Sequence, residues 1–530
     1  MTSAEIIIVG AGPSGTFAAY QLRGRGPLVL DVGYRAQESA LDGNFYELRK
    51  ASSAGGPDLF AELIGPGFES LHNVFGSSLS PRLKGPRMRF VTRGAAELSP
   101  VVSQNFEALM SFAAGGMANA WGAGLYRFTA DDLAGYPISV LDLEPYYDAI
   151  TTKVGISGAD DDLSRFFGSV RGLLPPVALG ANGRAVLRRY TRRRESLNRR
   201  GLYIGHPRLA VLTRDHDGRR AYRYDALECF RPNDPAVYTP TYTLDELVRR
   251  GEILYERGVL VERYTESSAG ISVLARSCAT GERRTFRCRR LILAAGALNT
   301  AKIVLKSNDD HVTTLPLLDS NRSSIPLIDP WGIGAALDRS VYSAAMLKAV
   351  YAGEHGAGPA HMALYAAGVG TLCSDYLFDF PLSAQGNIAA AKYLTPALLL
   401  VQLSYPDAPT PANHLRLLPD DRLELRYASK PASPVESQVL GLFRELGYLG
   451  ALGLCRRLTP GNSCRYAGAL PMTATPVGRY QTDRHGLLSG TRSVYVADAA
   501  NFTVLPSNSH SFTMMANAMR IAEHVGRTVG

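Results

Sequence analysis

The sequence predicts an α/β protein, α+β overall, in which a Rossmann-like domain is discontinuous and an inserted second domain has a mainly antiparallel sheet. Three observations support this prediction. The chain begins with the continuous apolar run Ile6–Val9, and a glycine-rich turn and a helical pattern follow it, as in the first unit of a dinucleotide fold. Buried strands of the same kind recur at Leu291–Ala295 and Ser493–Ala497. The beginning, middle and end of the chain are therefore expected to share one parallel sheet.

The N-terminal third is predicted to alternate between regular elements and loops. Gly15–Arg25 has a helical pattern, and Leu28–Leu30 is a second apolar strand. Residues 36–100 are rich in Gly, Pro and Ser, which predicts loops with little regular structure. A helix is expected over Asp142–Ile150, with its cap near Ser139.

The remaining elements follow from residue periodicity. Residues 240–310 predict a strand meander that leads into the buried strand at 291–295. The expected strands are Ile253–Tyr264, Gly270–Arg276, Arg283–Cys288 and, further on, Leu398–Ser404; the expected helices are Pro434–Leu446 and Thr513–Val525.

These patterns divide the chain into five segments. The nucleotide-binding domain is assigned residues 1–160, 205–310 and 456–530. Residues 161–204 are an arginine-rich excursion, and residues 311–455 form the second domain, which is expected to face the substrate.

The composition narrows the class of protein. No apolar run approaches the roughly 20 residues that span a membrane, and no secretion signal precedes the first strand, so a cytoplasmic protein is expected. The net charge of +9 owes much to arginines between Arg188 and Arg200. Because no nucleic-acid-binding signature accompanies them, we interpret this cluster as a solvated helix face, with an anionic partner as the alternative.

The cysteines and histidines predict no metal site. The six cysteines form no C-x-x-C pair, and the ten histidines have no metal-ligand spacing. Cys278 and Cys288 flank a turn and could face each other across a hairpin. In a chain without an export signal we expect free thiols.

The first turn has the pattern of a dinucleotide site. Gly10, Gly12 and Gly15 fit G-x-G-x-x-G, in which the glycines make a tight turn, admit a pyrophosphate and allow the helix to pack on the strand. Asp31 ends the next strand, where a carboxylate accepts both ribose hydroxyls. NAD and FAD both fit this pattern, whereas the acidic group disfavours NADP despite Arg35 nearby.

Several later stretches resemble one flavoprotein family. They are Asp31–Gly33, the loop Gly115–Gly122, the stretch Tyr136–Tyr147, the strand and turn Leu291–Ala301, the strand Val494–Ala499 and the helix region Asn508–Ala522. Together they resemble the glucose–methanol–choline family of FAD-dependent oxidoreductases, and in part its pyranose oxidase-like members. Residues 311–450 match only loosely.

The resemblance implies FAD as the cofactor. Some pyranose-oxidising members attach FAD through a histidine just before the loop tryptophan; Ala120 stands there, so the FAD is expected to be non-covalent. Besides the glycine turn, the resemblance assigns cofactor contacts to Gly116, Asn119, Trp121, Gly122, Gly296, Asp498 and Ala499.

The catalytic residues implied by the resemblance include one departure. His510 matches the polar residue that precedes the last helix, although a shifted register would put Ser509 or Asn508 there. The second catalytic position, normally histidine, is Arg465, and an arginine is a poor general base. Three interpretations remain: His510 is the base and Arg465 holds substrate or flavin; Arg465 binds an anionic substrate; or the chemistry is different.

The leading function is therefore oxidation of a CH–OH group of a small hydroxylated metabolite, such as a sugar or cyclitol, by hydride transfer to flavin N5. The alternatives are elimination or decarboxylation, an anionic substrate held by Arg465, or a flavin-stabilised binding protein. The electron acceptor is O₂ or another compound, and the sequence leaves the oligomeric state open.

Overall fold

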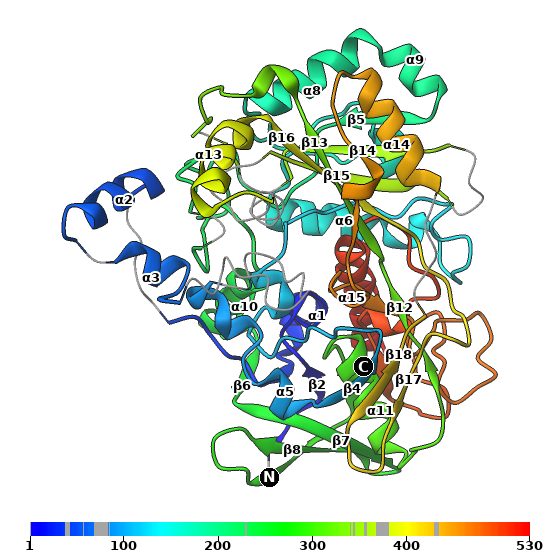
Figure 1. Ribbon diagram of the computed structural model, residues 1–530. Coiled ribbons are helices and arrows are strands. Elements are labelled where there is room, and N and C mark those ends of the chain that lie inside the picture. The colour runs from blue at the N-terminus through cyan, green and yellow to red at the C-terminus, as the bar shows by residue number, and fades with distance from the viewer. Residues whose placement is uncertain are drawn as a thin grey trace.

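The computed structural model describes residues 2–37, 43–56, 58–67, 83, 85–227, 230–339, 341–342, 345–353, 358–366, 381–428 and 434–529. It contains parallel and antiparallel sheets together with helices, so the predicted mixed class is confirmed. Figure 1 shows a parallel sheet in the lower half of the molecule and an antiparallel sheet in the upper half. The helix α15 (Ser511–Arg527) begins between them.

The parallel sheet has the strand order β21–β10–β2–β3–β6. Its strands are β21 (Val494–Val496), β10 (Arg290–Leu293), β2 (Ile6–Val9), β3 (Leu28–Asp31) and β6 (Leu254–Arg257). All four neighbouring pairs are parallel. Strands from the beginning, middle and end of the chain thus lie side by side, as the sequence predicts.

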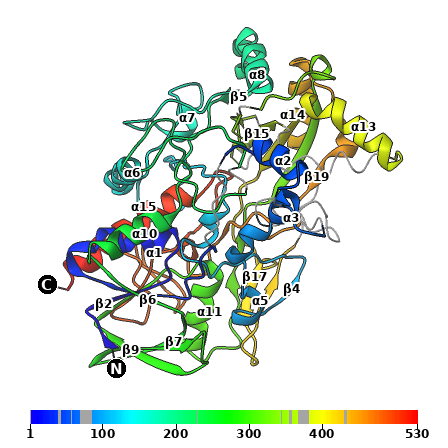
Figure 2. The same ribbon diagram turned by 90° about the vertical axis from the view of Figure 1, so that its left-hand side faces the viewer.

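Both faces of this sheet are covered by other elements, which explains why β21, β10, β2 and β3 are mainly apolar; the edge strand β6 is partly exposed. Ile6 and Ile8 pack with side chains of α1 (Pro13–Gln21), α10 (Pro240–Arg249) and α15, whereas Ile7 and Val9 pack with the meander on the opposite face. Figure 2 shows these three helices bundled beside β2 and β6.

The meander is formed by β7 (Val259–Ser267), β8 (Gly270–Ser277) and β9 (Arg283–Cys288), with β1 (Thr2–Ser3) on its edge. The expectation that it starts at residue 240 is wrong, because 240–249 form α10, with Pro240 in its first turn. The hairpin pairing of Cys278 with Cys288 is also wrong, since Cys288 lies opposite Ile271. Both cysteines are free, as expected; Cys229 and Cys373 lie outside the described residues.

The antiparallel sheet has the order β19–β13–β16–β15–β14–β5. Its strands are β19 (Arg456–Arg457), β13 (Arg322–Ile328), β16 (Leu398–Ser404), β15 (Ala360–Ala366), β14 (Leu347–Tyr351) and β5 (Leu202–Gly205). The strand predicted at 398–404 is confirmed. The excursion 161–204 contributes β5, and its helices α8 (Ala181–Arg192) and α9 (Arg194–Arg199) pack with α14 (Pro434–Glu445) against one face of the sheet.

A smaller sheet joins β11 (Leu315–Pro316), β17 (His414–Leu417), β18 (Leu423–Arg426) and β4 (Val101–Gln104). It packs with the helix α11 (Ala297–Ser307) in the same apolar core as the meander. The pair β12 (Leu318–Asp319) and β20 (Tyr466–Ala467) links the 311–455 segment to the C-terminal one.

Helices account for most other differences from prediction. The described parts of 36–100 contain α2 (Phe45–Ser53), α3 (Leu59–Leu63) and α5 (Ala95–Leu98), where loops were expected. A capping box between Asn44 and Glu47 starts α2. The predicted helix at 142–150 is confirmed as α6 (Val140–Val154), with Ser139 as its cap. Two further helices are α7 (Ser164–Phe167) and α13 (Ala384–Leu394).

The arginine cluster is mostly exposed, as expected for a solvated helix face, and three of its arginines form ion pairs. Arg189 pairs with Asp329 at 2.9 Å, Arg194 pairs with Asp162, and Arg200 pairs with Glu445. The cluster therefore joins the helices to acidic residues of neighbouring segments. Across the described part of the chain, no helix has the length and apolar character needed to cross a membrane.

Candidate functional site

A cavity of about 940 Å³ lies between the carboxyl ends of the parallel strands and one face of the antiparallel sheet. Val9, Leu30 and Ala294 line it from the parallel sheet, and Ala363 and Gln402 line it from the antiparallel sheet. The carboxyl ends of parallel strands are the usual place for a nucleotide in such a fold. The volume is that of a site for a large cofactor together with a small molecule.

The glycine turn between β2 and α1 is shaped by two different constraints. A Cβ on Gly10 would lie 2.5 Å from the carbonyl oxygen of Ala294, and one on Gly15 would lie 1.9 Å from that of Gly10, so both glycines are needed for the fold. A Cβ on Gly12 would meet nothing within 4 Å. Gly12 and Ser14 line the cavity, and the buried Ser14 hydroxyl has no partner among the described residues. The start of α1 thus offers free polar groups to an anion.

Asp31 lies where the sequence predicts a ribose-binding carboxylate. It ends β3, lines the cavity and accepts a hydrogen bond from the Tyr255 hydroxyl at 3.0 Å. Burial raises the pKa of its carboxyl to about 7. Arg35 is engaged elsewhere, because its guanidinium pairs with Asp245 at 2.5 Å.

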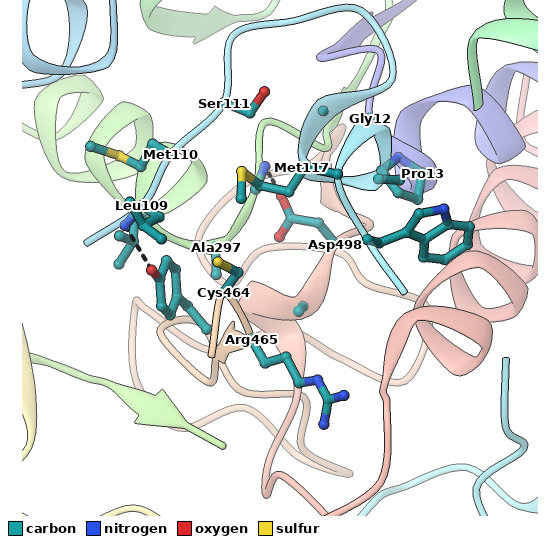
Figure 3. Close-up of a pocket in the computed structure, with 18 of the residues that line it drawn as sticks. Gly12, Pro13, Leu109, Met110, Ser111, Met117, Ala297, Cys464, Arg465 and Asp498 are labelled. Carbon is teal, nitrogen blue, oxygen red and sulfur yellow. Dashed lines mark hydrogen bonds between the residues drawn. The ribbon is translucent and has the colours of Figure 1, made fainter. Parts of the chain in front are cut away.

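The second glycine-rich loop lies against the first. A Cβ on Gly116 would lie 3.3 Å from the Cα of Gly12, so the two loops touch. Asn119 faces into its own loop: its side-chain nitrogen donates to the carbonyls of Ala114 and Gly116, each at 2.8 Å, and Asn119 does not line the cavity. Figure 3 shows Met117 and Pro13 side by side at the junction of the two loops.

The end of this loop opens on the cavity. Trp121 and Gly122 line it, and the Trp121 indole donates to the carbonyl of Tyr238 at 2.9 Å, which holds the ring in place. A Cβ on Gly122 would meet nothing within 4 Å. Ala120 also lines the cavity and offers no group for a covalent bond to a cofactor.

Asp498 joins two elements of the parallel sheet. Its carboxylate accepts from the backbone N–H of Gly296 at 2.8 Å and from the Thr300 hydroxyl at 2.6 Å, and it also caps the turn at Ala500. Burial raises the pKa of Asp498 to about 6. Gly296, Asp498 and Ala499 all line the cavity (Figure 3 shows Asp498).

These residues fit a bound FAD. Gly12, Gly122 and Gly296 all border space that a Cβ would enter without contact, as a flat ring system and a pyrophosphate require. Asp31, at the end of β3, and the start of α15 both line this cavity. In contrast, Gly15 and Asn119 shape the loops from behind.

His510 immediately precedes α15 and lines the cavity with Ser509 and Ser511. It is 5% exposed, and its ring nitrogen Nδ1 has no partner in the described part of the chain. Burial, together with the charges of Arg465 and Arg322, lowers the pKa of His510 to about 3, so the ring is neutral at pH 7 and is a weak base while those charges have no counter-charge. Asn508 is fully buried and does not line the cavity.

Arg465 lies in the cavity, across from the cofactor loops. Burial, and secondarily the charge of Arg322, lowers its pKa to about 9. Its Nη1 has no hydrogen-bond partner in the described structure, and Figure 3 shows the guanidinium extending away from Asp498 and Cys464.

The sequence interpretation missed a polar face on the antiparallel sheet. In β16, Leu399, Val401 and Leu403 face the apolar core, whereas Leu400, Gln402 and Ser404 line the cavity. The same alternation brings Arg322 and Ser324 of β13, Lys348 of β14, and Ala363 and Tyr365 of β15 into the cavity. Isolated polar residues at alternate positions of apolar strands were the available signal.

Sequence comparisons identify no relative: no family model matches the chain, and no curated protein sequence matches it. Among solved structures, the chain is similar to pyridoxine 4-oxidase from Mesorbium loti, with a TM-score of 0.59 and 15% identity. The match covers 98% of this chain and 99% of that chain. The two chains share one fold. At this identity the likeness extends to the fold alone.

Proposed function

We propose that the protein is an FAD-dependent oxidoreductase that oxidises a CH–OH group of a small hydroxylated metabolite, such as a sugar or cyclitol. The observation that carries the proposal is the position of His510, a buried neutral histidine with a free ring nitrogen in the same cavity as the dinucleotide turn. The resemblance of the cofactor loops to glucose–methanol–choline flavoproteins supports it, as does the fold shared with an oxidase.

FAD would be held non-covalently. The start of α1 and Gly12 would bind the pyrophosphate, and Asp31 the ribose. Gly116, Trp121, Gly122, Gly296, Asp498 and Ala499 would surround the remainder of the cofactor, with Asn119 holding the second loop in shape. Bound FAD supplies the hydride acceptor of the reaction.

Groups of the protein would accept the hydroxyl proton of the substrate and stabilise the charge that develops. His510 would take the hydroxyl proton of the substrate on its free nitrogen as the carbon–hydrogen bond breaks. The backbone N–H groups at the start of α15 point out of the helix toward the cavity, where they favour negative charge. Buried side chains around His510 exclude water from the reacting atoms.

The first experiment is an absorption spectrum of the purified protein, followed by anaerobic mixing with a panel of sugars and cyclitols. We expect a flavin spectrum that bleaches with at least one compound. His510→Asn should slow bleaching by roughly 10²- to 10⁴-fold, the usual contribution of a general base, with flavin content unchanged.

His414→Asn is the matched control, because His414 is partly exposed on β17 outside the cavity. Bleaching at the wild-type rate in His510→Asn would remove His510 as the base. A folded protein that takes up no FAD would overturn the proposed function.

A further inference from the structure

Three positively charged side chains converge on the cavity beyond the proposed flavin site. Arg322 comes from β13, Lys348 from β14, and Arg465 from the segment before β20. They lie close enough to influence one another: the charges of Arg465 and Arg322 add to burial in holding the pKa of Lys348 well below its usual value. Without a counter-charge, such a cluster is costly to bury.

None of the three has a carboxylate partner among the described residues. No ion pair within 4.0 Å involves Arg322, Lys348 or Arg465, although such pairs are frequent elsewhere on the chain. Lys348 is 5% exposed, and its ammonium group lies over the ring of Tyr126, 4.7 Å from the ring centroid. The buried Nε of Arg322 and Nη1 of Arg465 have no hydrogen-bond partner in the described structure.

Strand register places two of these cations, Lys348 and Arg322, beside a row of small and neutral residues on the face of the sheet that lines the cavity. Lys348 pairs with Ala363, Ala363 with Gln402, and Gln402 with Ser324, which gives one row across four strands. Arg322 lies two residues from Ser324 along β13, so β14 and β13 carry their cations three strand spacings apart, about 14 Å between backbones.

Four of the five carboxylates that line the cavity are engaged elsewhere, and the fifth, Glu97, is exposed on α5. Glu262 pairs with Arg276 at 3.0 Å and Asp421 with Lys306 at 2.8 Å, both on the meander and α11 side. Asp31 and Asp498 belong to the proposed cofactor site and are held by the hydrogen bonds described above. One carboxylate outside the cavity lining, the buried Asp319, interacts electrostatically with Arg322 and Arg465, but it accepts hydrogen bonds from Gly461 and Ser463 and forms no ion pair within 4.0 Å with the three cations in the described structure. One carboxylate leaves the three cations with an excess of positive charge.

We propose that the substrate carries an oxyanion, a carboxylate or a phosphate, which Arg322, Lys348 and Arg465 bind while its CH–OH group lies beside His510. The inference rests on the proposed function for the identity of that reaction, whereas the anion site rests on the three cations alone. Guanidinium groups match both oxyanions through paired N–H bonds, and the ammonium of Lys348 adds a compact charge.

An anion in this place would also act on His510. Arg465 and Arg322 add to burial in lowering the pKa of His510. An oxyanion between them offsets their charge, so His510 becomes a stronger base when the substrate is bound. Arg465, which replaces the histidine expected from the family resemblance, then has a function in substrate binding.

Binding is tested first, because it does not depend on turnover or on flavin. The protein as purified is titrated with inorganic phosphate and, separately, with glucuronate in a calorimeter at constant ionic strength. We expect Lys348→Met to weaken binding of the accepted anion by roughly 10- to 100-fold. Lys50→Met is the matched control, since Lys50 is exposed on α2 and is not part of the cavity lining.

Lys348→Met replaces a buried cation by an apolar side chain of similar length, so the variant should fold with at least wild-type thermal stability. Arg465→Met provides a second, independent removal of one charge. If neither phosphate nor glucuronate binds, or if both variants bind as the wild type does, the proposed anion site is wrong.

Turnover then distinguishes the two anions. Glucose, glucuronate and glucose 6-phosphate are compared in the anaerobic flavin assay. A carboxylate site predicts preference for glucuronate and a phosphate site preference for glucose 6-phosphate, each lost in Lys348→Met. If glucose reduced the flavin as fast as the two anionic sugars do, the anionic substrate would be overturned but the proposed oxidation would stand. If the anions bound without reducing the flavin, the anion site would stand and the result would count against the proposed oxidation.

Discussion

Gly12 and Gly15 lie three residues apart in one turn, yet their replacement by alanine should have opposite effects. Gly12 has φ −72° and ψ −171°, which alanine tolerates, and its Cβ would meet nothing within 4 Å. Gly12→Ala should therefore leave the stability of the apoprotein within about 0.5 kcal/mol of wild type. The new methyl group would occupy the space proposed for the pyrophosphate.

The effect on the cofactor can be estimated from the bonds that the methyl group would prevent. Two backbone N–H bonds to a charged phosphate are worth roughly 1.5–3 kcal/mol each, so FAD should bind roughly 10²- to 10⁴-fold more weakly. In Gly15→Ala the Cβ would lie 1.9 Å from the Gly10 oxygen, where ordinary contact starts at 3.4 Å. Relief requires moving α1 away from β2, which should cost about 3 kcal/mol or more.

The assay combines two measurements on each variant. Quenching of FAD fluorescence by the apoprotein gives the affinity, and urea unfolding followed by circular dichroism gives the stability. We expect Gly12→Ala to lose FAD but keep its stability, and Gly15→Ala to lose stability. FAD affinity within threefold of wild type in Gly12→Ala, or wild-type stability in Gly15→Ala, would refute this reasoning.

Two further predictions concern pH. Hydrogen bonds from ribose favour the charged form of Asp31, whose pKa is about 7, so the affinity for FAD should rise about tenfold from pH 6 to pH 8. In Asp31→Asn the affinity for FAD should be weaker and should not change with pH. Fluorescence titration measures both affinities. Burial lowers the pKa of His361 well below 6.5 in the folded protein. As the pH falls, this histidine is therefore protonated in the unfolded chain before it is protonated in the folded protein. Below about pH 6.5, the wild type should therefore lose about 1.4 kcal/mol of its free energy of unfolding per pH unit relative to His361→Asn, as urea unfolding would measure. Parallel pH responses of the two proteins would contradict a neutral buried His361.

Local patterns predicted β21, β10, β2 and β3 of the parallel sheet because these strands are mostly buried and mainly apolar, whereas the edge strand β6 is partly exposed and ends in Glu256 and Arg257. The run at Ile6–Val9 and the helix that became α15 required no knowledge of distant residues. The backbone demands of the glycine turn are also local, and so is the position of Asp31 at the end of the next strand. Prediction failed at 240–249, where a periodicity interpreted as strand belongs to an amphipathic helix that begins at Pro240.

The residues on the antiparallel-sheet side of the cavity could not be predicted from local patterns in the same way. From the sequence, Arg465 was interpreted as holding substrate or flavin, or as binding an anionic substrate, whereas Arg322 and Lys348 were not recognised. The three residues are far apart in the sequence. The pairing of β13, β16, β15 and β14 decides that Arg322 and Lys348 share one face of the sheet, and Arg465 enters the same cavity from the segment before β20. A shift of one residue in any of these pairings would turn the corresponding side chains to the opposite face.

Local sequence patterns predicted one half of the proposed site: the strand–turn–helix unit, the acidic residue after it and the polar residue before the last helix. These features depend on backbone geometry and burial within short segments. The presence of Arg322, Lys348 and Arg465 in one cavity with His510 depends instead on the tertiary structure. Strand register places Arg322 and Lys348 on one face of the antiparallel sheet, and the segment before β20 carries Arg465 into the same cavity; both depend on contacts between residues that no local pattern connects.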